Sequence, residues 1–420
     1  MVVTFALLIF ALGYLAITLE HKIHINKSAV ALFVGTSLWL MLLFDQSIHI
    51  EEAIGESAIE IFEIVIFLLA AMSLVEVLVH YKFFDIVRGK IHAIGLGERK
   101  QYLLVAVIAF FLSAIIDNLT TTIVMTQISR RFFQKDNLLI AVATIVISAN
   151  AGGAFSPIGD VTTIMLWLAG KFGTGEIMLQ GFLPSVALLV TVLFLLYPKV
   201  KEIPFEIESE IVTKLSRSEK IVVVLTFASF SLPLIMGLVS VPPYVGLLIG
   251  LSVVWIVVDL FKKFRPRQTH LEASIEEFIQ KTDIASLMFF VGILMAVSAL
   301  SHLGLLDSLS HMIYGTSPSD IQVIFGNIGM GAISAILDNV PLTAIAIEVL
   351  HVSNSSLWVL LALAVGTGGS LLIVGSAAGV VAMGMVKELN FGNYLRIAAL
   401  PALVGYLAAM LVWYVQFLIF

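Results

Sequence analysis

Two polar segments within otherwise apolar sequence carry residues that could do chemistry. The first, at 113–118, reads Ser-Ala-Ile-Ile-Asp-Asn, and the second, at 334–339, reads Ser-Ala-Ile-Leu-Asp-Asn. Each holds a hydroxyl, a carboxylate and an amide, whose oxygens are the ligands that a small hard cation prefers. Such groups are costly inside a membrane unless they have a function. The repeated motif therefore predicts an ion or substrate site.

A glycine-rich polar segment follows each motif. Residues 150–163 read Asn-Ala-Gly-Gly-Ala-Phe-Ser-Pro-Ile-Gly-Asp-Val-Thr-Thr, and residues 366–376 read Gly-Thr-Gly-Gly-Ser-Leu-Leu-Ile-Val-Gly-Ser. Aligned on their Gly-Gly pairs, these segments place Asp160 opposite Ser376. Both offsets are about half the chain, which predicts an internal repeat with the site between its halves. The unmatched carboxylate of Asp160 suggests a task for one half alone, such as proton coupling.

The predicted cation and proton site combines both motifs with both glycine-rich segments. Sodium is assigned to Asp117, Asn118 and Asp160, and Asp160 is predicted to alternate between Na⁺ and H⁺. Helix capping is the alternative role for these aspartates, and it is compatible with ion binding. Asn150 could be a ligand or could satisfy a backbone group freed by the break. The candidate residues are Ser113, Asp117, Asn118, Asn150, Ser156, Gly159, Asp160, Thr162, Thr163, Ser334, Asp338, Asn339 and Ser376.

Composition places these residues in a membrane protein. Of the 420 residues, 60% are hydrophobic and only 12% are charged, with a mean hydropathy of +1.06, whereas soluble proteins carry about 25% charged residues. The absence of cysteine excludes disulfides and thiol chemistry. The run 2–19 lacks the basic start and the cleavage site of a signal peptide, so a retained helix is expected. No phosphate-binding Gly-x-x-x-x-Gly-Lys motif occurs, and no cofactor is expected beyond the transported ions.

The lengths of the apolar runs indicate how the polar segments are positioned. Runs 102–133 and 319–350 are too long for one crossing and short for two, which favours re-entrant helical hairpins that turn at Asp-Asn. Runs 137–170 and 356–386 contain the glycine-rich segments, which indicates helices unwound at mid-membrane, where such backbone must be buried or line a cavity.

These elements predict an all-α polytopic membrane protein with about ten transmembrane helices, two re-entrant hairpins and two broken helices. Each half then crosses the membrane five times, so the two halves have opposite orientations and form an inverted repeat. The predicted units are a first repeat at 1–198, a cytoplasmic linker at 199–218 and a second repeat at 219–420.

The basic residues support this topology. With both termini outside, the predicted inner loops hold 22 of the 23 Lys and Arg residues, and only Lys171 lies outside. In this topology no Lys or Arg lies in the polar centre. Segments 82–96 and 303–316, just before each hairpin, mix polar and apolar residues at helical spacing and are expected to lie along the membrane surface. Four glutamates are assigned to rims and surfaces: Glu60, Glu63, Glu76 and Glu348.

The motifs resemble those of the NhaD-type sodium/proton antiporters of the ion transporter superfamily. The resemblance rests on the segments from Ser113 and Ser156, on 334–343, and on the opening Leu-Glu-His…Ile-Asn-Lys of 19–27. It spans nearly the whole chain. It implies a scaffold domain, a transport domain with opposed hairpins, elevator-like movement and a homodimer. The superfamily's dicarboxylate carriers have neutral residues where this chain has aspartates, which argues against a carboxylate substrate.

The sequence thus favours a secondary transporter, not an enzyme, that exchanges Na⁺ for H⁺ across a bacterial-type inner membrane, with Li⁺ as a second candidate ion. The lipid bilayer and these ions are its expected partners, and no nucleic acid is expected. One alternative is an anion carrier for arsenite or an organic acid, since helix N-termini bind anions. A remote alternative is an intramembrane aspartyl protease, whose motifs differ from those around Asp117 and Asp160.

Overall fold

The fold is helical throughout the residues that the computed structural model describes, which are 2–18, 20–43, 50–202, 215–264, 275–315 and 318–419. The first half contains α1 (Val2–Thr18), α2 (Glu20–Ile23), α3 (Lys27–Leu42), α4 (Ile50–His80), α5 (Phe83–Ala93), α6 (Glu98–Ser113), α7 (Asn118–Phe132), α8 (Lys135–Ala154), α9 (Val161–Leu168), α10 (Thr174–Leu196) and η1 (Tyr197–Lys199). The second half contains α11 (Arg217–Ser229), α12 (Leu232–Leu238), α13 (Pro243–Phe264), α14 (Ile275–Lys281), α15 (Ile284–His302), α16 (Leu305–Ile313), α17 (Asp320–Ile333), α18 (Asn339–Val349), α19 (Ser355–Gly368), η2 (Ile373–Gly375), α20 (Ala377–Met385), α21 (Phe391–Tyr394), η3 (Leu395–Ala399) and α22 (Leu400–Ile419).

Seven helical stretches in the described residues are long and apolar enough to span a membrane. The chain is therefore an integral membrane protein, as its composition predicts. Several helices around the polar segments are shorter: α17, α18 and α19 have 14, 11 and 14 residues. At 1.5 Å per residue these three are too short to cross a bilayer alone.

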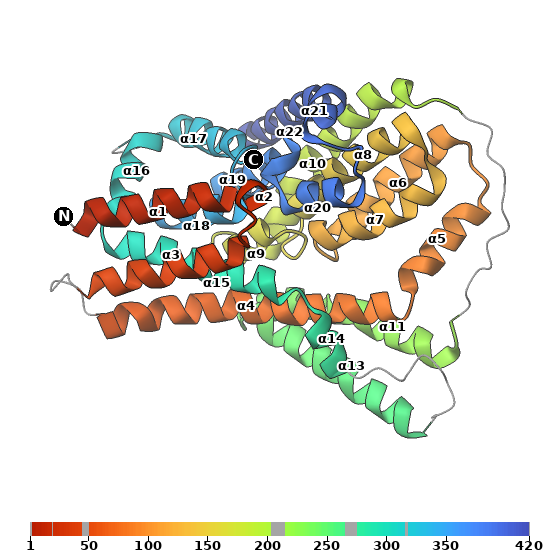
Figure 1. The fold of residues 1–420 in the computed structure, drawn as a ribbon, viewed down its shortest axis with the longest axis horizontal. Coiled ribbons are helices and arrows are strands. Elements are labelled where there is room, and N and C mark those ends of the chain that lie inside the picture. Colours follow the sequence, from red (N-terminus) through yellow and green to blue (C-terminus); the bar gives the residue numbers. More distant parts are fainter. Residues whose placement is uncertain are drawn as a thin grey trace.

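The helices form two groups, each drawn from both halves of the sequence. In one group, α3 packs against α1 and α15, and α4 packs against α13 and α15. In the other group, α8 packs against α6, α7, α10 and α19, and α22 packs against α10 and α19. The two groups touch where α15 meets α18 and where α4 meets α9 (Figure 1).

The helices are interrupted where the polar motifs predicted interruptions. Residues 114–117 separate α6 from α7, and residues 334–338 separate α17 from α18. Residues 155–160 separate α8 from α9, where Pro157 cannot donate a backbone hydrogen bond. Helical breaks therefore surround the polar residues of both halves.

Glycine contacts at these breaks are duplicated between the halves. A methyl group built on Gly152 would overlap the carbonyl oxygen of Phe110, and one on Gly368 would overlap that of Gly331. The same relation links the next glycines along the chain, where a methyl on Gly153 would lie 2.5 Å from the Gly159 oxygen and one on Gly369 would lie 2.8 Å from the Gly375 oxygen. Because a side chain would fit at none of these four positions, glycine permits the same close backbone approach twice.

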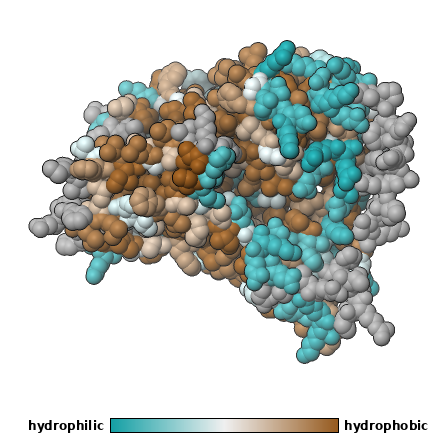
Figure 2. Space-filling view, in the orientation of Figure 1, coloured by the Kyte–Doolittle hydropathy of each residue, from teal (hydrophilic) through white to brown (hydrophobic). Residues whose placement is uncertain are grey.

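Hydropathy is uneven over the visible surface. Figure 2 shows hydrophobic residues across the middle of this face, with hydrophilic residues gathered toward the end where α5 and the last turns of α13 lie. Arg88 and Lys90 of α5, together with Lys262 and Lys263 of α13, contribute basic charge there. On this face, hydrophilic residues are therefore concentrated toward one end of the molecule (Figure 2).

Helices also occur within both segments predicted to be amphipathic. They are α5, within 82–96, and α16, within 303–316. Most of the predicted linker 199–218 lies outside the described residues, because 203–214 are not described.

Candidate functional site

Asp160 is the buried carboxylate at the centre of the polar segments. It is the N-cap residue of α9, in an extended backbone conformation, and is only 1% exposed. Its Oδ1 accepts a hydrogen bond from the Thr162 backbone N–H at 3.1 Å. The position therefore combines a capping role with a carboxylate held deep among the helices.

Two equivalent asparagines, one from each repeated motif, donate to this carboxylate. Asn118 Nδ2 lies 3.2 Å from Asp160 Oδ2, and Asn339 Nδ2 lies 3.2 Å from Asp160 Oδ1. Asn118 begins α7, and Asn339 begins α18. The two motifs thus converge on a single acidic side chain, as the sequence predicted for neighbours of one site.

Asn150 connects Asp160 to the second glycine-rich segment. Its Oδ1 accepts from Asn118 at 2.9 Å, and its Nδ2 donates to Ser370 Oγ at 2.8 Å and Ser376 Oγ at 3.1 Å. These side-chain partners favour a role in the polar network over the satisfaction of freed backbone. Ser370 was missed as a candidate although it ends the Gly-Gly-Ser of the second segment, and that hydroxyl was the available signal.

The aspartates of the two motifs cap helices and also face a cavity. Asp117 Oδ1 accepts from the Thr120 backbone N–H at 2.7 Å, and Asp338 Oδ1 accepts from the Val340 backbone N–H at 3.2 Å. The capping alternative is thus confirmed for both, and Asp160 is likewise a cap. Because one carboxylate has two oxygens and several lone pairs, a capping aspartate can still bind a cation.

A cavity of about 80 Å³ adjoins these groups. Its lining includes the three aspartates and the two asparagines that the sequence selected: Asp117, Asn118, Asp160, Asp338 and Asn339. Apolar side chains such as Phe67, Ile116 and Phe289 form much of the remaining wall. The arrangement offers hard oxygen ligands and titratable carboxyls in a confined space, which is what binding a small cation or a proton requires.

Three of the predicted serine ligands instead bind backbone in this structure. Ser113 Oγ donates to the Ala149 carbonyl at 2.6 Å, and Ser334 Oγ donates to the Val365 carbonyl at 2.9 Å. Ser156 Oγ donates to the Ala114 carbonyl at 2.6 Å. None of the three is among the cavity-lining residues. Their hydroxyls tie the breaks to neighbouring helices.

The remaining candidates, Gly159, Thr162, Thr163 and Ser376, differ in their contacts. Thr163 Oγ1 donates to the Asp160 carbonyl at 2.8 Å, whereas the fully buried Thr162 Oγ1 has no hydrogen-bond partner among the described residues. Gly159 packs against the Ser113 backbone, because a methyl on it would lie 2.6 Å from the Ser113 oxygen. Ser376 caps α20 by accepting from the Gly379 backbone N–H at 3.2 Å.

Lys27 corrects the expectation that no basic side chain reaches the polar centre. It lines the same cavity, and its Nζ lies 3.8 Å from Asp338 Oδ2. Lys27 was assigned to an inner loop because the predicted topology places the N-terminus outside. In the structure it begins α3 and lines the central cavity together with Met72 of α4.

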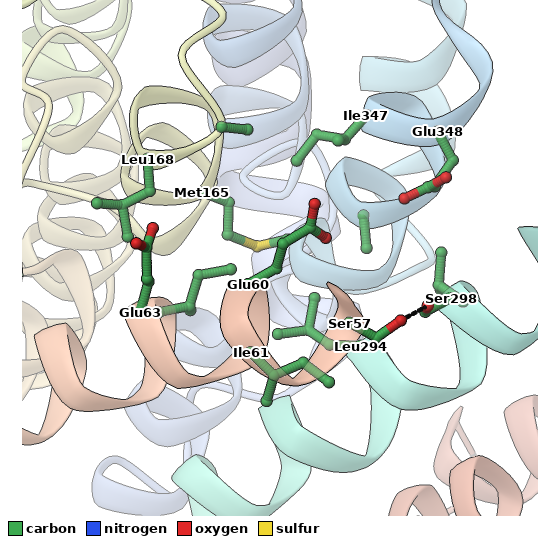
Figure 3. Close-up of a pocket in the computed structure, with 14 residues that line it drawn as sticks. Ser57, Glu60, Ile61, Glu63, Met165, Leu168, Leu294, Ser298, Ile347 and Glu348 are labelled. Atoms are coloured by element: carbon green, nitrogen blue, oxygen red, sulfur yellow. Dashed lines mark hydrogen bonds between the residues drawn. The ribbon is translucent and has the colours of Figure 1, made fainter. Parts of the chain in front are cut away.

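A second cavity, of about 310 Å³, lies between α4, α9, α15 and α18. Figure 3 shows Glu60 of α4 and Glu348 of α18 projecting into it, and Glu63 also lines it. Glu348 accepts a hydrogen bond from Ser301 Oγ at 2.5 Å. The sequence assigned these glutamates to rims, and it did not predict that residues so far apart would share one cavity.

Known proteins with similar sequences extend over nearly the whole chain. Residues 5–366 match the family described as Citrate transporter, CitMHS. Sodium/proton antiporter 2 of Arabidopsis thaliana is 35% identical over 97% of this chain and 98% of its own. The Na(+)/H(+) antiporter NhaD of Vibrio cholerae is 31% identical over 90% of this chain and 84% of its own. The chain belongs to the CitMHS family and to the NhaD-type sodium/proton antiporters.

This NhaD-type membership confirms the resemblance drawn from the motifs. Sodium/proton antiporter 1 of Arabidopsis thaliana is also 35% identical, over 96% of this chain and 70% of its own. The names describe transporters, so the protein is a secondary transporter of this family and not an enzyme. In this NhaD-type protein, residues of both repeated motifs form the polar network around Asp160.

Proposed function

We propose that this protein exchanges Na⁺ for H⁺ across the membrane, and that Asp160 binds the two ions in turn. The observation that carries the proposal is the buried Asp160 carboxylate, held by equivalent asparagines of both motifs beside a cavity with two further aspartates. The relatives named as sodium/proton antiporters support the same pair of ions.

The coupling follows from competition at one carboxylate. A protonated carboxyl is neutral and a poor ligand for a cation, whereas a bound cation favours the ionised form. Sodium binding therefore releases the proton, and protonation releases sodium. Asn118 and Asn339 now donate to Asp160, and a half-turn of either amide would present its oxygen to a cation instead.

The proposed ligand set extends beyond Asp160 to Asp117 and Asn118. Their oxygens line the cavity that contains the Asp160 carboxylate. Asp338 and Asn339 supply the equivalent groups from the second half. The buried hydroxyl of Thr162, which lacks a hydrogen-bond partner among the described residues, is a further oxygen close to Asp160.

We further propose that the two halves form an inverted repeat with opposed re-entrant hairpins, α6–α7 and α17–α18. The duplicated glycine contacts and the shortness of α17 and α18 support this arrangement. Movement of the helices around α8 and α19 relative to those around α3 and α15 would be elevator-like. The protein would act as a homodimer in a cell membrane of the bacterial inner type, with both termini outside.

The anion-carrier alternative is weaker on charge grounds. Three carboxylates and one ammonium line the central cavity, so its formal charge is negative before any protonation. An anionic substrate would be repelled by that charge, even though Lys27 is present. The cavity favours cations.

Transport by reconstituted protein tests the proposal. Purified protein in vesicles with an imposed pH gradient should move protons when Na⁺ is added and should not respond to citrate, and Li⁺ is tested alongside Na⁺. Potassium added at the same ionic strength is the control. Proton movement driven by citrate and not by Na⁺ would overturn the proposal in favour of anion transport.

A further inference from the structure

Lys27 is the only basic residue among the described residues that line the central cavity. Its ammonium lies 3.8 Å from Asp338 Oδ2 and 4.6 Å from the centre of the Phe289 ring. The side chains of Lys27 and Asp338 are 27% and 20% exposed, so both are largely removed from solvent. A cation belonging to the protein therefore already occupies one side of a carboxylate in the proposed sodium site.

The chain fixes the position of Lys27 with several specific contacts. Glu20 Oε1 accepts from the Lys27 backbone N–H at 3.0 Å, and Asn26 Oδ1 accepts from the Ser28 backbone N–H at 2.8 Å. Ser28 Oγ then donates to the Ala285 carbonyl of α15 at 2.6 Å. Together these bonds anchor the start of α3 to α15 and thereby set where the Lys27 side chain begins.

Backbone strain and helix electrostatics both oppose the position of Lys27, so other contacts must stabilise it. His24, in the turn before α3, has a φ of 55°, a region that non-glycine residues rarely adopt. Lys27 is the first residue of α3, where the unpaired N–H groups give the helix end a partial positive charge. A lysine at that point is repelled by its own helix, and the Asp338 carboxylate is the attraction that offsets this.

The ion pair also joins the two groups of helices. Lys27 belongs to α3, which packs against α15 and α1, whereas Asp338 lies between α17 and α18. Any cation that displaces the ammonium from Asp338 breaks this link between the groups. Ion occupancy and the contact between the groups are thus connected through one carboxylate.

We propose that Lys27 is a tethered cation that competes with Na⁺ for Asp338 and holds the α17–α18 pair to α3 when sodium is absent. The proposal rests on the sodium/proton exchange proposed above. Without bound sodium, the ammonium neutralises Asp338 and keeps the two groups linked. With sodium at the cavity, the carboxylate turns to the metal ion and the link is released.

Substitutions of Lys27 with opposite expected effects test the competition. In Lys27→Gln the competing charge is gone, so the Na⁺ concentration for half-maximal proton release should fall, by up to about fivefold for a partly exposed ion pair. In Lys27→Arg the planar guanidinium can grip the carboxylate with two hydrogen bonds, so that concentration should rise by about as much. A purely structural lysine would not produce shifts of opposite sign.

Matched controls locate the effect at Asp338. Lys201 forms an exposed ion pair with Asp136, at 3.3 Å, so Lys201→Gln removes a lysine of similar pairing far from the cavity and should behave as wild type. In an Asp338→Asn background, Lys27→Gln should have no further effect on the sodium concentration required, because the shared carboxylate is absent.

The measurement is proton release from purified protein on addition of Na⁺, with thermal stability recorded for each variant. If both Lys27 variants match wild type, or if both shift the sodium requirement in the same direction, the competition is refuted. Should Lys27→Gln fail to fold, Lys27→Arg alone tests the competition: a higher sodium requirement supports it, and an unchanged or lower one refutes it. If wild type itself releases no protons on adding Na⁺, the exchange function fails instead, which is a separate outcome.

Discussion

Asp160 and Ser376 occupy equivalent positions in the two glycine-rich breaks, one before α9 and the other before α20. Their backbone angles nearly coincide, with φ of −146° and −136° and ψ of 146° in both. Each side chain caps the helix that follows, Asp160 through Thr162 and Ser376 through Gly379. The backbone therefore does not require a carboxylate at this position, since a hydroxyl caps equally well in the other half.

The two breaks differ chemically at two positions. Asn150 in the first half stands where the second half has Gly366, and Asp160 stands where it has Ser376. A methyl group on Gly366 would lie 3.2 Å from Asp160 Oδ2, so the missing side chain leaves room for the carboxylate of the other half. The packing around the breaks is therefore repeated in both halves, whereas the central carboxylate occurs in the first half only.

Removing the unmatched carboxylate should have the largest effect. Asp160→Asn keeps the size of the side chain and an oxygen for capping, but it cannot titrate. We expect sodium-driven proton movement in vesicles to fall to the level of protein-free vesicles. Ser376→Ala is the matched control, because it alters the equivalent position of the other half, and it should retain most of the exchange.

Two results would contradict the expected difference between Asp160→Asn and Ser376→Ala. If Asp160→Asn still releases protons on sodium addition as wild type does, the coupling lies at Asp117 or Asp338. If Ser376→Ala abolishes exchange as fully as Asp160→Asn, the two breaks are functionally equivalent. Asp160→Glu, which keeps a titratable group, should retain some exchange with an altered pH profile.

The duplicated glycines should respond alike. Gly152→Ala and Gly368→Ala each force a methyl group against a carbonyl oxygen of a neighbouring helix, that of Phe110 or Gly331. Overpacking of this kind costs about 1–3 kcal/mol, so both variants should lose thermal stability by similar amounts. Thermal unfolding of purified protein measures this, with Gly175→Ala, where a methyl meets open space, as the control. Strong destabilisation in one half only would contradict a duplicated packing.

The two asparagines sharpen the comparison further. Asn118 donates to both Asp160 and Asn150, whereas Asn339 donates to Asp160 alone among the described residues. When sodium is bound, the proposed contact is the amide oxygen on the cation, and losing one contact to a charged group costs about 1.5–3 kcal/mol, or about tenfold or more in affinity. Asn118→Ala should therefore raise the sodium concentration for half-maximal exchange more than Asn339→Ala does. Equal effects would show that the contact with Asn150 contributes little.

Local sequence patterns predicted the breaks and the capping residues well. Asp-Asn motifs have direct backbone consequences, so α7 begins at Asn118 and α18 at Asn339, where the hairpins were expected to turn. The preceding helices end earlier than expected, α6 at Ser113 and α17 at Ile333. The internal repeat also indicated that the two Asp-Asn motifs would approach one centre. Both inferences rest on short motifs that can be recognised directly in the sequence.

Contacts between distant segments were harder to predict. Lys27 reaches Asp338 because the start of α3 lies beside the central cavity, which depends on how α3 packs against α15. Likewise, the hydroxyl of Ser113 turns to the Ala149 carbonyl because α6 and α8 approach closely at Gly152. Tertiary packing decides which group a hydroxyl contacts. The residue type alone therefore predicted a cation ligand at Ser113, where the structure has a hydrogen bond between helices.

The smallest effect should come from the equivalent serines, Ser113 and Ser334. Each hydroxyl donates to a helix carbonyl, at 2.6 Å to Ala149 and 2.9 Å to Val365. A single neutral hydrogen bond contributes about 1 kcal/mol, so Ser113→Ala and Ser334→Ala should lower thermal stability slightly and equally. Exchange should persist in both, because neither residue lines the central cavity. If Ser113→Ala alone weakens the response to sodium with its stability unchanged, the Ser113 hydroxyl is a sodium ligand in another state of the transport cycle, and the chemical asymmetry between the halves extends beyond the two breaks.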